Sequence, residues 1–255
     1  MYPILFSYKL ITIGSYGLLL GAAFYISFLL IEREFQMKKI DPELAYKLLI
    51  AIIPSAIIGA KLFHILDNFS EFLSAPFSMI FSGAGLSVYG GFILSFIAAM
   101  VVIKNNNEGI LKIFDATSPA MALGYAIGRL GCHASGDGCY GLPTDSFLGM
   151  AYPNGIVPST SNVFPTPLFE SFASLIFFLI LMRLRKHEMK TGILFFIYLI
   201  MNGFARFTIE FIRLNPPTSI GLTQAQIIAI CFITAGIVGL IAVNTKGSGL
   251  NHNAA

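Results

Sequence analysis

Hydrophobic residues form long runs along this chain, and short polar connections separate the runs. A bilayer crossing needs about 20 predominantly apolar residues. Segments of roughly that length cover residues 12–32, 45–66, 86–104, 115–132, 167–183, 193–213 and 222–243. The pattern therefore predicts an all-α integral membrane protein with seven transmembrane helices, arranged as a single domain over residues 1–255.

Two of these segments call for separate interpretation. Residues 1–32 lack a basic start and a small-residue cleavage site, so we expect a retained helix rather than a signal peptide. The segment 115–132 is more polar than the others and carries Gly124 and Gly128 one turn apart. Small residues at this spacing favour close helix packing. This segment is therefore predicted to be an inner helix that contacts protein rather than lipid.

Lysine and arginine are concentrated in alternate connections. The connections after the first, third and fifth predicted helices are basic, whereas residues 67–85 and 133–166 contain neither Lys nor Arg. The positive-inside rule then places the N-terminus outside and the C-terminus in the cytoplasm. The two loops without Lys or Arg become outer-face arms. Long Gly- and Pro-containing loops are often functional, so 133–166 is predicted to be a mobile lid.

Composition supports a membrane setting and limits the classes of binding partner to expect. The chain is 56% hydrophobic and 11% charged, against about 25% charged residues in soluble domains. The net charge of +3 comes without a clustered basic face, so we expect a lipid bilayer as partner and no nucleic acid. Cys132 and Cys139 are compatible with a disulfide or with two free thiols. We expect no cofactor and no bound metal.

Ionisable residues inside predicted spans are costly and usually functional. With the orientation above, the following seven fall in the outer halves of their helices: Lys61, His64, Arg129, Glu170, Arg206, Glu210 and Arg213. This one-sided distribution predicts a polar chamber that opens toward the outer leaflet. It also argues against a small solute transporter, which needs polar groups toward both faces.

Helical spacing gathers several polar residues on two faces. Tyr125, Arg129 and His133 follow one another at i, i+4 and i+8, and so do Asn202, Arg206 and Glu210. These two triplets predict two polar helix faces that line one chamber.

The two arginines of these faces call for an anion. Arg206 and Glu210 can neutralise each other, while Arg213 and Lys61 are expected to snorkel toward the interface. Arg129 has no acid within one turn of its own helix. Two guanidinium groups from different helices, with at most one shared carboxylate, therefore predict an anion site. A phospholipid phosphate fits the guanidinium fork.

Several motifs at these positions resemble one known family. They read GSYGLLLG, GAKLFHIL, GLSVYGG, GRLGCHASGD, YGLPTD, PTPLFE and GFARFTIEFIR. Together they are similar to the prolipoprotein diacylglyceryl transferases. The resemblance implies a seven-helix enzyme of the bacterial inner membrane. Such an enzyme moves the diacylglyceryl group of phosphatidylglycerol onto the lipobox cysteine beside a prolipoprotein signal peptide, releasing glycerol phosphate.

The resemblance also implies site residues. Arg129 and Arg206 match the essential arginines, and further matching positions are Glu170, Glu210, Tyr16, Gly90, Gly91 and Gly141. The chain departs from the usual pattern at Tyr89 for His, Cys132 and Ser135 for Asn, Asp137 for Glu, and Asn202 for Tyr. The implied phosphate clamp is retained, while groups nearer the proton transfers differ. A phospholipid-binding paralogue with another acceptor, or without catalysis, is the alternative interpretation.

The missing family histidine raises the question of which group moves the proton. A phenol is a poor base at neutral pH, whereas an imidazole exchanges protons there. We therefore hypothesise that His133 takes the proton-transfer role, with Arg206 stabilising the leaving phosphate and Tyr89 orienting the headgroup. His133 as a solvated loop residue is the equal alternative.

Overall fold

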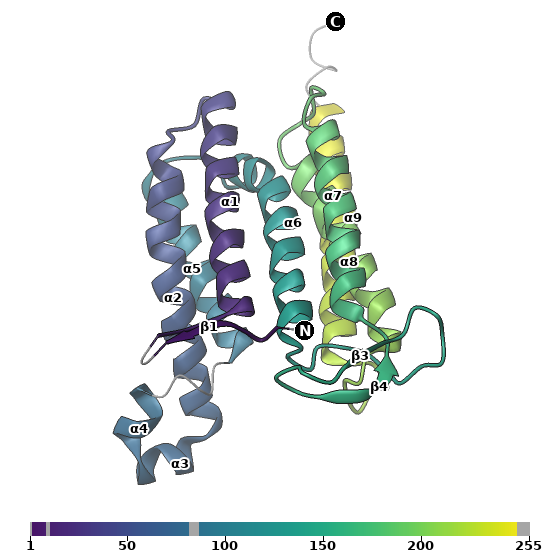
Figure 1. The fold of residues 1–255 in the computed structure, drawn as a ribbon. Helices are drawn as coiled ribbons and strands as arrows, with labels where there is room; N and C mark the ends of the chain where they lie inside the picture. The colour runs from purple at the N-terminus through teal and green to yellow at the C-terminus, as the bar shows by residue number, and fades with distance from the viewer. Residues whose placement is uncertain (1, 9–10, 82–86, 249–255) are drawn as a thin grey trace, which may run out of the picture. The chain divides into compact units, whose positions relative to one another are not determined.

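The computed structural model describes residues 2–8, 11–81 and 87–248, which are mostly helical (Figure 1). The elements are β1 (Ile4–Tyr8), β2 (Ile11–Gly14), α1 (Ser15–Met37), α2 (Glu43–Asp67), α3 (Phe69–Ser74), α4 (Pro76–Phe81), α5 (Val88–Asn105), α6 (Ile110–Ser135), β3 (Met150–Tyr152), β4 (Ser159–Val163), α7 (Thr166–Leu184), α8 (Ile193–Ile209), the 3₁₀ turn η1 (Glu210–Ile212) and α9 (Gln224–Ser248). Each of the seven predicted apolar segments lies largely in a helix.

Within the described residues, five helices are long and apolar enough to cross a bilayer. They are Ser15–Met37, Glu43–Asp67, Thr166–Leu184, Ile193–Ile212 and Gln224–Thr245. A shorter apolar helix covers Tyr89–Asn105, and α6 carries the polar and small residues that its sequence predicts. The chain is therefore a helical, multi-pass membrane protein.

The expectation of a helix from the first residue is wrong for residues 4–8 and 11–14. There β1 pairs antiparallel with β2, and the hydroxyl groups of Ser7 and Thr12 lie 3.2 Å apart across the ladder. The β-branched residues Ile11, Thr12 and Ile13 favour a strand over a helix. The first helix consequently begins at Ser15.

The chain forms two compact units, residues 1–30 with 114–255 and residues 31–113. In the second unit α2 and α5 pack through glycine. A side chain at Gly90 would overlap the backbone carbonyl of Gly59 and the side chain of Phe63. Gly91 approaches Ala56 in the same way. The backbones of the two helices therefore touch where neither carries a side chain.

In the first unit, serine hydroxyls join α6 to its neighbours. Ser171 and Ser174 of α7 donate hydrogen bonds to the carbonyl oxygens of Ala126 and Ala122, over 2.8 and 2.9 Å. Ser27 of α1 donates to the carbonyl of Ala120 over 3.1 Å. These bonds confirm that α6 contacts protein on these faces. Of its two predicted packing glycines, Gly124 lies against Ser27, whereas nothing lies within 4 Å of a side chain added at Gly128, so the expectation is wrong for Gly128.

An aspartate on α6 sets the position of α8. The two carboxylate oxygens of Asp115 accept hydrogen bonds from the backbone N–H of Gly192 (2.6 Å) and of Phe195 (2.8 Å). Both donors lie in the first turn of α8, where backbone N–H groups have no partner within the helix. This cap acts across 77 residues of sequence. It holds α8 against α6, so that the polar faces of the two helices belong to one site.

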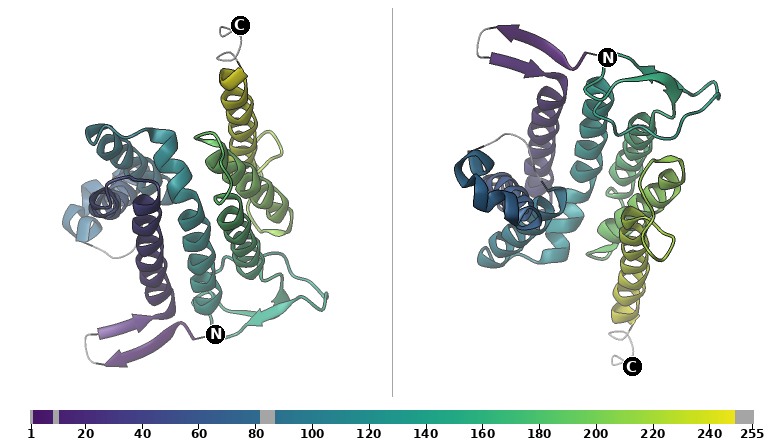
Figure 2. Two further views of the ribbon diagram at one scale, coloured as in Figure 1. Left: turned by 90° about the horizontal axis from the view of Figure 1, so that it is seen from above. Right: turned by 90° about the horizontal axis from the view of Figure 1, so that it is seen from below.

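The two small hairpins lie at one end of the first unit (Figure 2). This is the end at which α6 finishes, since the N–H of Tyr2 bonds to the carbonyl of Ala134 over 3.2 Å. In the segment 133–166, Tyr152 is fully buried and packs with Tyr140 and Val163. Part of this predicted lid is thus a packed substructure with its own apolar cluster.

Candidate functional site

Glu170 on α7 is the centre of a charged cluster. Its carboxylate forms ion pairs with Nε of Arg129 (3.0 Å), Nη1 of Arg206 (2.6 Å) and Nη1 of Arg213 (3.4 Å). The hydroxyl of Tyr125 donates a hydrogen bond to the same carboxylate over 3.2 Å. The Glu170 side chain is 4% exposed. Three guanidinium groups from α6, α8 and the end of η1 therefore converge on one buried carboxylate.

A second carboxylate holds Arg206 from the other side. Nη2 of Arg206 lies 3.0 Å from Oε2 of Glu210, and Asn215 donates a hydrogen bond to Oε1 of Glu210 over 2.6 Å. Among these ion-paired residues, three guanidinium groups share two carboxylates. The cluster thus carries an excess of one positive charge. Burial makes an excess charge costly unless an anion binds it.

Helix periodicity explains the local placement of two of the three arginines. Cζ of Arg129 lies 4.9 Å from the ring centroid of Tyr125, one turn earlier on α6. Arg206 and Glu210 pair at the same spacing on α8 and η1. The contacts confirm that Arg129 shares a helix face with Tyr125, and that Arg206 shares one with Glu210. The shared carboxylate expected between the two arginines is Glu170.

The expectation that Arg213 snorkels to the interface is wrong. Its side chain is 10% exposed and reaches Glu170. After α8 ends, the 3₁₀ turn is followed by extended backbone at Arg213, which forms an isolated bridge with Gly141. A side chain at Gly141 would overlap the carbonyl of Ile212. Gly141 therefore lets the backbone beside Arg213 approach closely, which keeps this arginine at the cluster.

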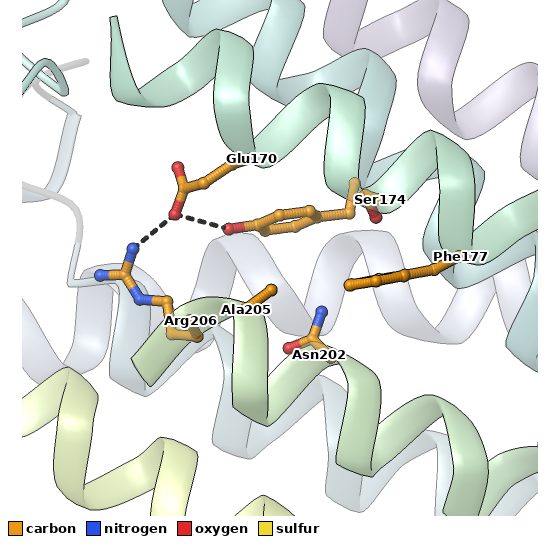
Figure 3. Close-up of a pocket in the computed structure, with 7 residues that line it drawn as sticks. Glu170, Ser174, Phe177, Asn202, Ala205 and Arg206 are labelled. Carbon is orange, nitrogen blue, oxygen red and sulfur yellow. Dashed lines mark hydrogen bonds and ion pairs between the residues drawn. The ribbon is translucent and has the colours of Figure 1, made fainter. Parts of the chain in front are cut away.

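A small pocket opens beside this cluster (Figure 3). Its lining residues come from α6, α7 and α8, and they are Tyr125, Glu170, Ser174, Phe177, Asn202, Ala205 and Arg206. The charged groups of Glu170 and Arg206 lie at one end, while Phe177 lies farther along the pocket (Figure 3). This arrangement suits a ligand with an anionic part and an apolar part.

His133 hydrogen-bonds outside the arginine cluster. Its Nδ1 lies 3.0 Å from the hydroxyl of Tyr152, and the two rings meet edge to face. Burial raises the pKa of Tyr152 to about 12, so its hydroxyl stays protonated at neutral pH. His133 is therefore oriented by a buried tyrosine rather than being a freely solvated loop residue. Its role in proton transfer stays a prediction.

Other predicted site residues lie around the end of α6. Tyr16 of α1 packs on Gly131, since a side chain at Gly131 would lie 3.3 Å from the Tyr16 ring. The carboxylate of Asp137 accepts a hydrogen bond from the N–H of Cys139 over 3.1 Å. A hydrogen bond with Cys132 lowers the pKa of the Cys139 thiol to about 7. Cys132, Cys139 and Cys231 all lie in the part of the chain that the structure describes, and each is a free thiol there.

Three predicted residues belong to the second unit. Tyr89 begins α5 and is 51% exposed, whereas Gly90 and Gly91 serve the close contact between α2 and α5. Their proposed part in substrate binding stays a prediction. The glycines have a structural role that is sufficient to account for their presence.

Two residues of the cluster were missed from the sequence. Asn215 lies beyond the predicted helix, so helical spacing could not predict its hydrogen bond to Glu210. Arg213 was named but assigned to the interface. Its spacing of seven residues from Arg206, two helical turns, was the available signal. The 3₁₀ turn that brings Arg213 to the cluster has no recognisable sequence motif.

Comparison with known proteins identifies the family. A family model described as prolipoprotein diacylglyceryl transferase matches residues 3–242. The chain belongs to the prolipoprotein diacylglyceryl transferase family. This finding confirms the resemblance carried by the motifs. It also places the cluster around Glu170 within a family whose name implies a lipid group as cargo.

Curated relatives that carry this family name are similar to the chain over most of their length. The phosphatidylglycerol–prolipoprotein diacylglyceryl transferase of Leptospira interrogans serovar copenhageni is 31% identical over 247 residues, covering 84% of this chain and 78% of the relative. The protein of that name from Clostridium tetani is 30% identical over 240 residues, covering 93% of this chain and 96% of the relative. The one from Finegoldia magna is 30% identical over 227 residues, covering 88% of each.

Proposed function

We propose that this protein transfers the diacylglyceryl group of phosphatidylglycerol to the lipobox cysteine of prolipoproteins. Family membership and the names of the relatives support the reaction class. The observation that carries the proposal is the excess positive charge of the buried cluster around Glu170. A phosphodiester is the anion that a membrane supplies at such a site. The guanidinium fork binds its oxygens in pairs.

In this mechanism the arginines stabilise the leaving group. The acceptor thiolate attacks the terminal glyceryl carbon, the bond from that carbon to the phosphate oxygen breaks, and glycerol phosphate leaves with the electron pair. Negative charge then grows on the phosphate, where Arg129 and Arg206 bind it. Preorganised charge of this kind is often the largest catalytic contribution. Glu170 and Glu210 hold both guanidinium groups in place beforehand, so little reorganisation is needed.

His133 is the group that we assign to proton transfer. Its hydrogen bond to Tyr152 orients the ring, which a proton-transfer group requires. Replacement of His133 by Ala should nearly abolish transfer to a lipobox peptide while phosphatidylglycerol binding persists. Normal transfer by this variant across pH 6–8 would assign the role to another group.

The proposed membrane arrangement has seven spans. The N-terminus lies outside, the C-terminus lies in the cytoplasm, and the site faces the outer leaflet of the bacterial inner membrane. The whole chain acts as one transferase domain, with arms at 67–85 and 133–166 that help to present the prolipoprotein signal peptide. The distribution of Lys and Arg among the connections supports this orientation. Single cysteines at Ser146 or Ser159 should react with impermeant reagents in intact spheroplasts. Labelling only after permeabilisation would reverse the orientation.

Complementation of a transferase-depleted bacterium is the decisive test of the function. The wild-type chain should restore growth and lipoprotein maturation, and the Arg206→Ala variant should not. Failure of the wild type, combined with retained phosphatidylglycerol binding by the purified protein, would favour the phospholipid-binding paralogue. Solute uptake into proteoliposomes would favour the transporter.

A further inference from the structure

A second cluster of reactive side chains lies beside the arginines. Cys132, Asp137 and Cys139 each bring one ligand atom, a sulfur or a carboxylate oxygen, to within 4.8 Å of the other two. Cys132 lies in the last turns of α6, and the other two lie in the loop that follows. Cys132 is buried, whereas Asp137 and Cys139 are partly accessible. The cluster therefore has one closed side and one accessible side.

Two glycines with positive φ bring the loop back to the helix. Gly136 has a φ of +61° and Gly138 a φ of +87°, conformations that glycine adopts without steric cost. A side chain at Gly136 would also overlap the backbone of Gly155. Hydrogen bonds then hold the backbone carbonyls of both cysteines. Ser135 donates to Cys132 over 3.1 Å, and Thr166 donates to Cys139 over 2.6 Å.

The donor set matches a zinc ion with one open position. Two sulfurs and one carboxylate leave a tetrahedral ion a fourth site, the pattern of catalytic rather than structural zinc. Thiolates favour a soft or borderline ion over magnesium or calcium. With zinc–sulfur bonds of about 2.3 Å, the sulfur atoms would lie about 3.8 Å apart. The three ligand atoms lie within 4.8 Å of one another, so a movement of about 1 Å at most brings the two sulfurs to that separation.

A supporting contact orients the carboxylate. Oδ1 of Asp137 accepts a hydrogen bond from the N–H of Cys139 over 3.1 Å, so the carboxylate is held in the loop that carries the second thiol. Ligating carboxylates in metal sites are commonly held by such bonds.

The cluster also adjoins the phosphate-binding arginines. Nη1 of Arg129 lies 4.0 Å from the sulfur of Cys132. The same guanidinium group pairs with Glu170. An acceptor sulfur bound beside Cys132 would thus lie near the group that holds the leaving phosphate. Nucleophile and leaving group have to meet in this way during the proposed displacement.

We propose that Cys132, Asp137 and Cys139 bind one Zn²⁺, whose fourth position takes the thiolate of the acceptor cysteine. This inference rests on the proposed function and replaces the expectation of a metal-free site. The acceptor thiol passes its proton to His133, the group assigned to proton transfer above, as its sulfur binds the ion. A sulfur electron pair then forms the bond to the terminal glyceryl carbon, and the phosphate leaves as described above. No oxidant or reductant takes part.

Cobalt substitution tests the site on the purified full-length protein in detergent. One equivalent of Co²⁺ should bind, giving the near-ultraviolet charge-transfer band of thiolate ligands and the intense visible bands of a tetrahedral ion. Zn²⁺ should remove these bands in competition. Cys132→Ser and Cys139→Ser should each lose most of the charge-transfer band, and Asp137→Asn should weaken binding at least about tenfold. Cys231→Ser is the matched control, because Cys231 is exposed on α9, and it should bind Co²⁺ as the wild type does.

A peptide with a lipobox cysteine should change the visible cobalt spectrum, and the same peptide with serine should not. A wild type that binds no Co²⁺ under reducing conditions overturns the proposal. So does a Cys132–Cys139 disulfide, which would make the protein isolated without reductant lighter by two hydrogen atoms. An unchanged cobalt spectrum with the cysteine peptide overturns the acceptor role. These readouts need no turnover. Failure of the metal site is therefore distinguishable from failure of the transferase function, which complementation reports separately.

Discussion

Two helix contacts in this protein use opposite means of packing in a membrane. In the second unit α2 meets α5 backbone to backbone, through glycines that place no side chain between them. In the first unit α7 meets α8 at Glu170 and Arg206, a buried ion pair. A charge at the centre of a span costs about 2.5–3.5 kcal/mol by insertion scales. The glycine contact shows that the chain can pack helices without that cost, which supports the proposal that the charges serve binding.

The largest effect is expected from removing a guanidinium group. Arg206→Ala should reduce transfer from phosphatidylglycerol to a lipobox peptide by about a hundredfold or more, as loss of a preorganised charge contact does. Arg206→Lys should fail nearly as badly, because it loses the bidentate fork. Arg183→Ala, an exposed arginine in the last turn of α7, is the matched control. Turnover within a few-fold of wild type for Arg206→Ala would remove the clamp from the mechanism.

Substitution at the glycine contact should lower the stability of the protein rather than its catalytic activity. Gly90→Ala inserts a methyl group against the backbone of Gly59, and overpacking of this kind costs about 1–3 kcal/mol. The midpoint of thermal unfolding in detergent should therefore fall. Gly128→Ala is the control, because nothing lies within 4 Å of the added atom. Equal midpoints for the two variants would show that the contact between α2 and α5 does not depend on glycine.

Substitutions of Arg213 separate the effect of the cluster's net charge from the effect of the contacts that Arg213 itself makes. Arg213→Gln removes the excess positive charge and leaves Arg129 and Arg206 paired with Glu170. Binding of phosphatidylglycerol should weaken about tenfold, or about 1.4 kcal/mol, as measured by titration of lipid in nanodiscs. Arg213→Lys keeps the charge and should bind within a few-fold of wild type. Equal loss in both variants would assign Arg213 to geometry rather than to charge.

The smallest effect is expected at Tyr152. Tyr152→Phe removes one hydrogen bond to His133, and a typical bond of this kind contributes about 1 kcal/mol. Transfer should fall a few-fold, while lipid binding stays unchanged. Tyr25→Phe, at a tyrosine that is 64% exposed, controls for the loss of a hydroxyl. No change in transfer would show that the orientation of His133 is unimportant.

Helical periodicity predicted most of the helices and the contacts within single helices in the charged cluster. Each predicted span lies largely in a helix because long apolar runs have few alternatives in lipid. The pairs Tyr125–Arg129 and Arg206–Glu210 follow from i, i+4 spacing alone. The strand pair at residues 4–8 and 11–14 was missed, since short apolar runs fit a strand as well as a helix.

The sequence by itself determined that this protein is a helical membrane protein and which family it belongs to, and it predicted that arginines from two helices bind an anion. Only the tertiary structure decided that Glu170 is the carboxylate they share and that Arg213 joins them. It also placed Cys132, Asp137 and Cys139 together. The physical reason is that local spacing specifies a helix face, whereas contacts between distant segments depend on caps and turns. Asp115 at the start of α8 and the glycines after α6 are such features.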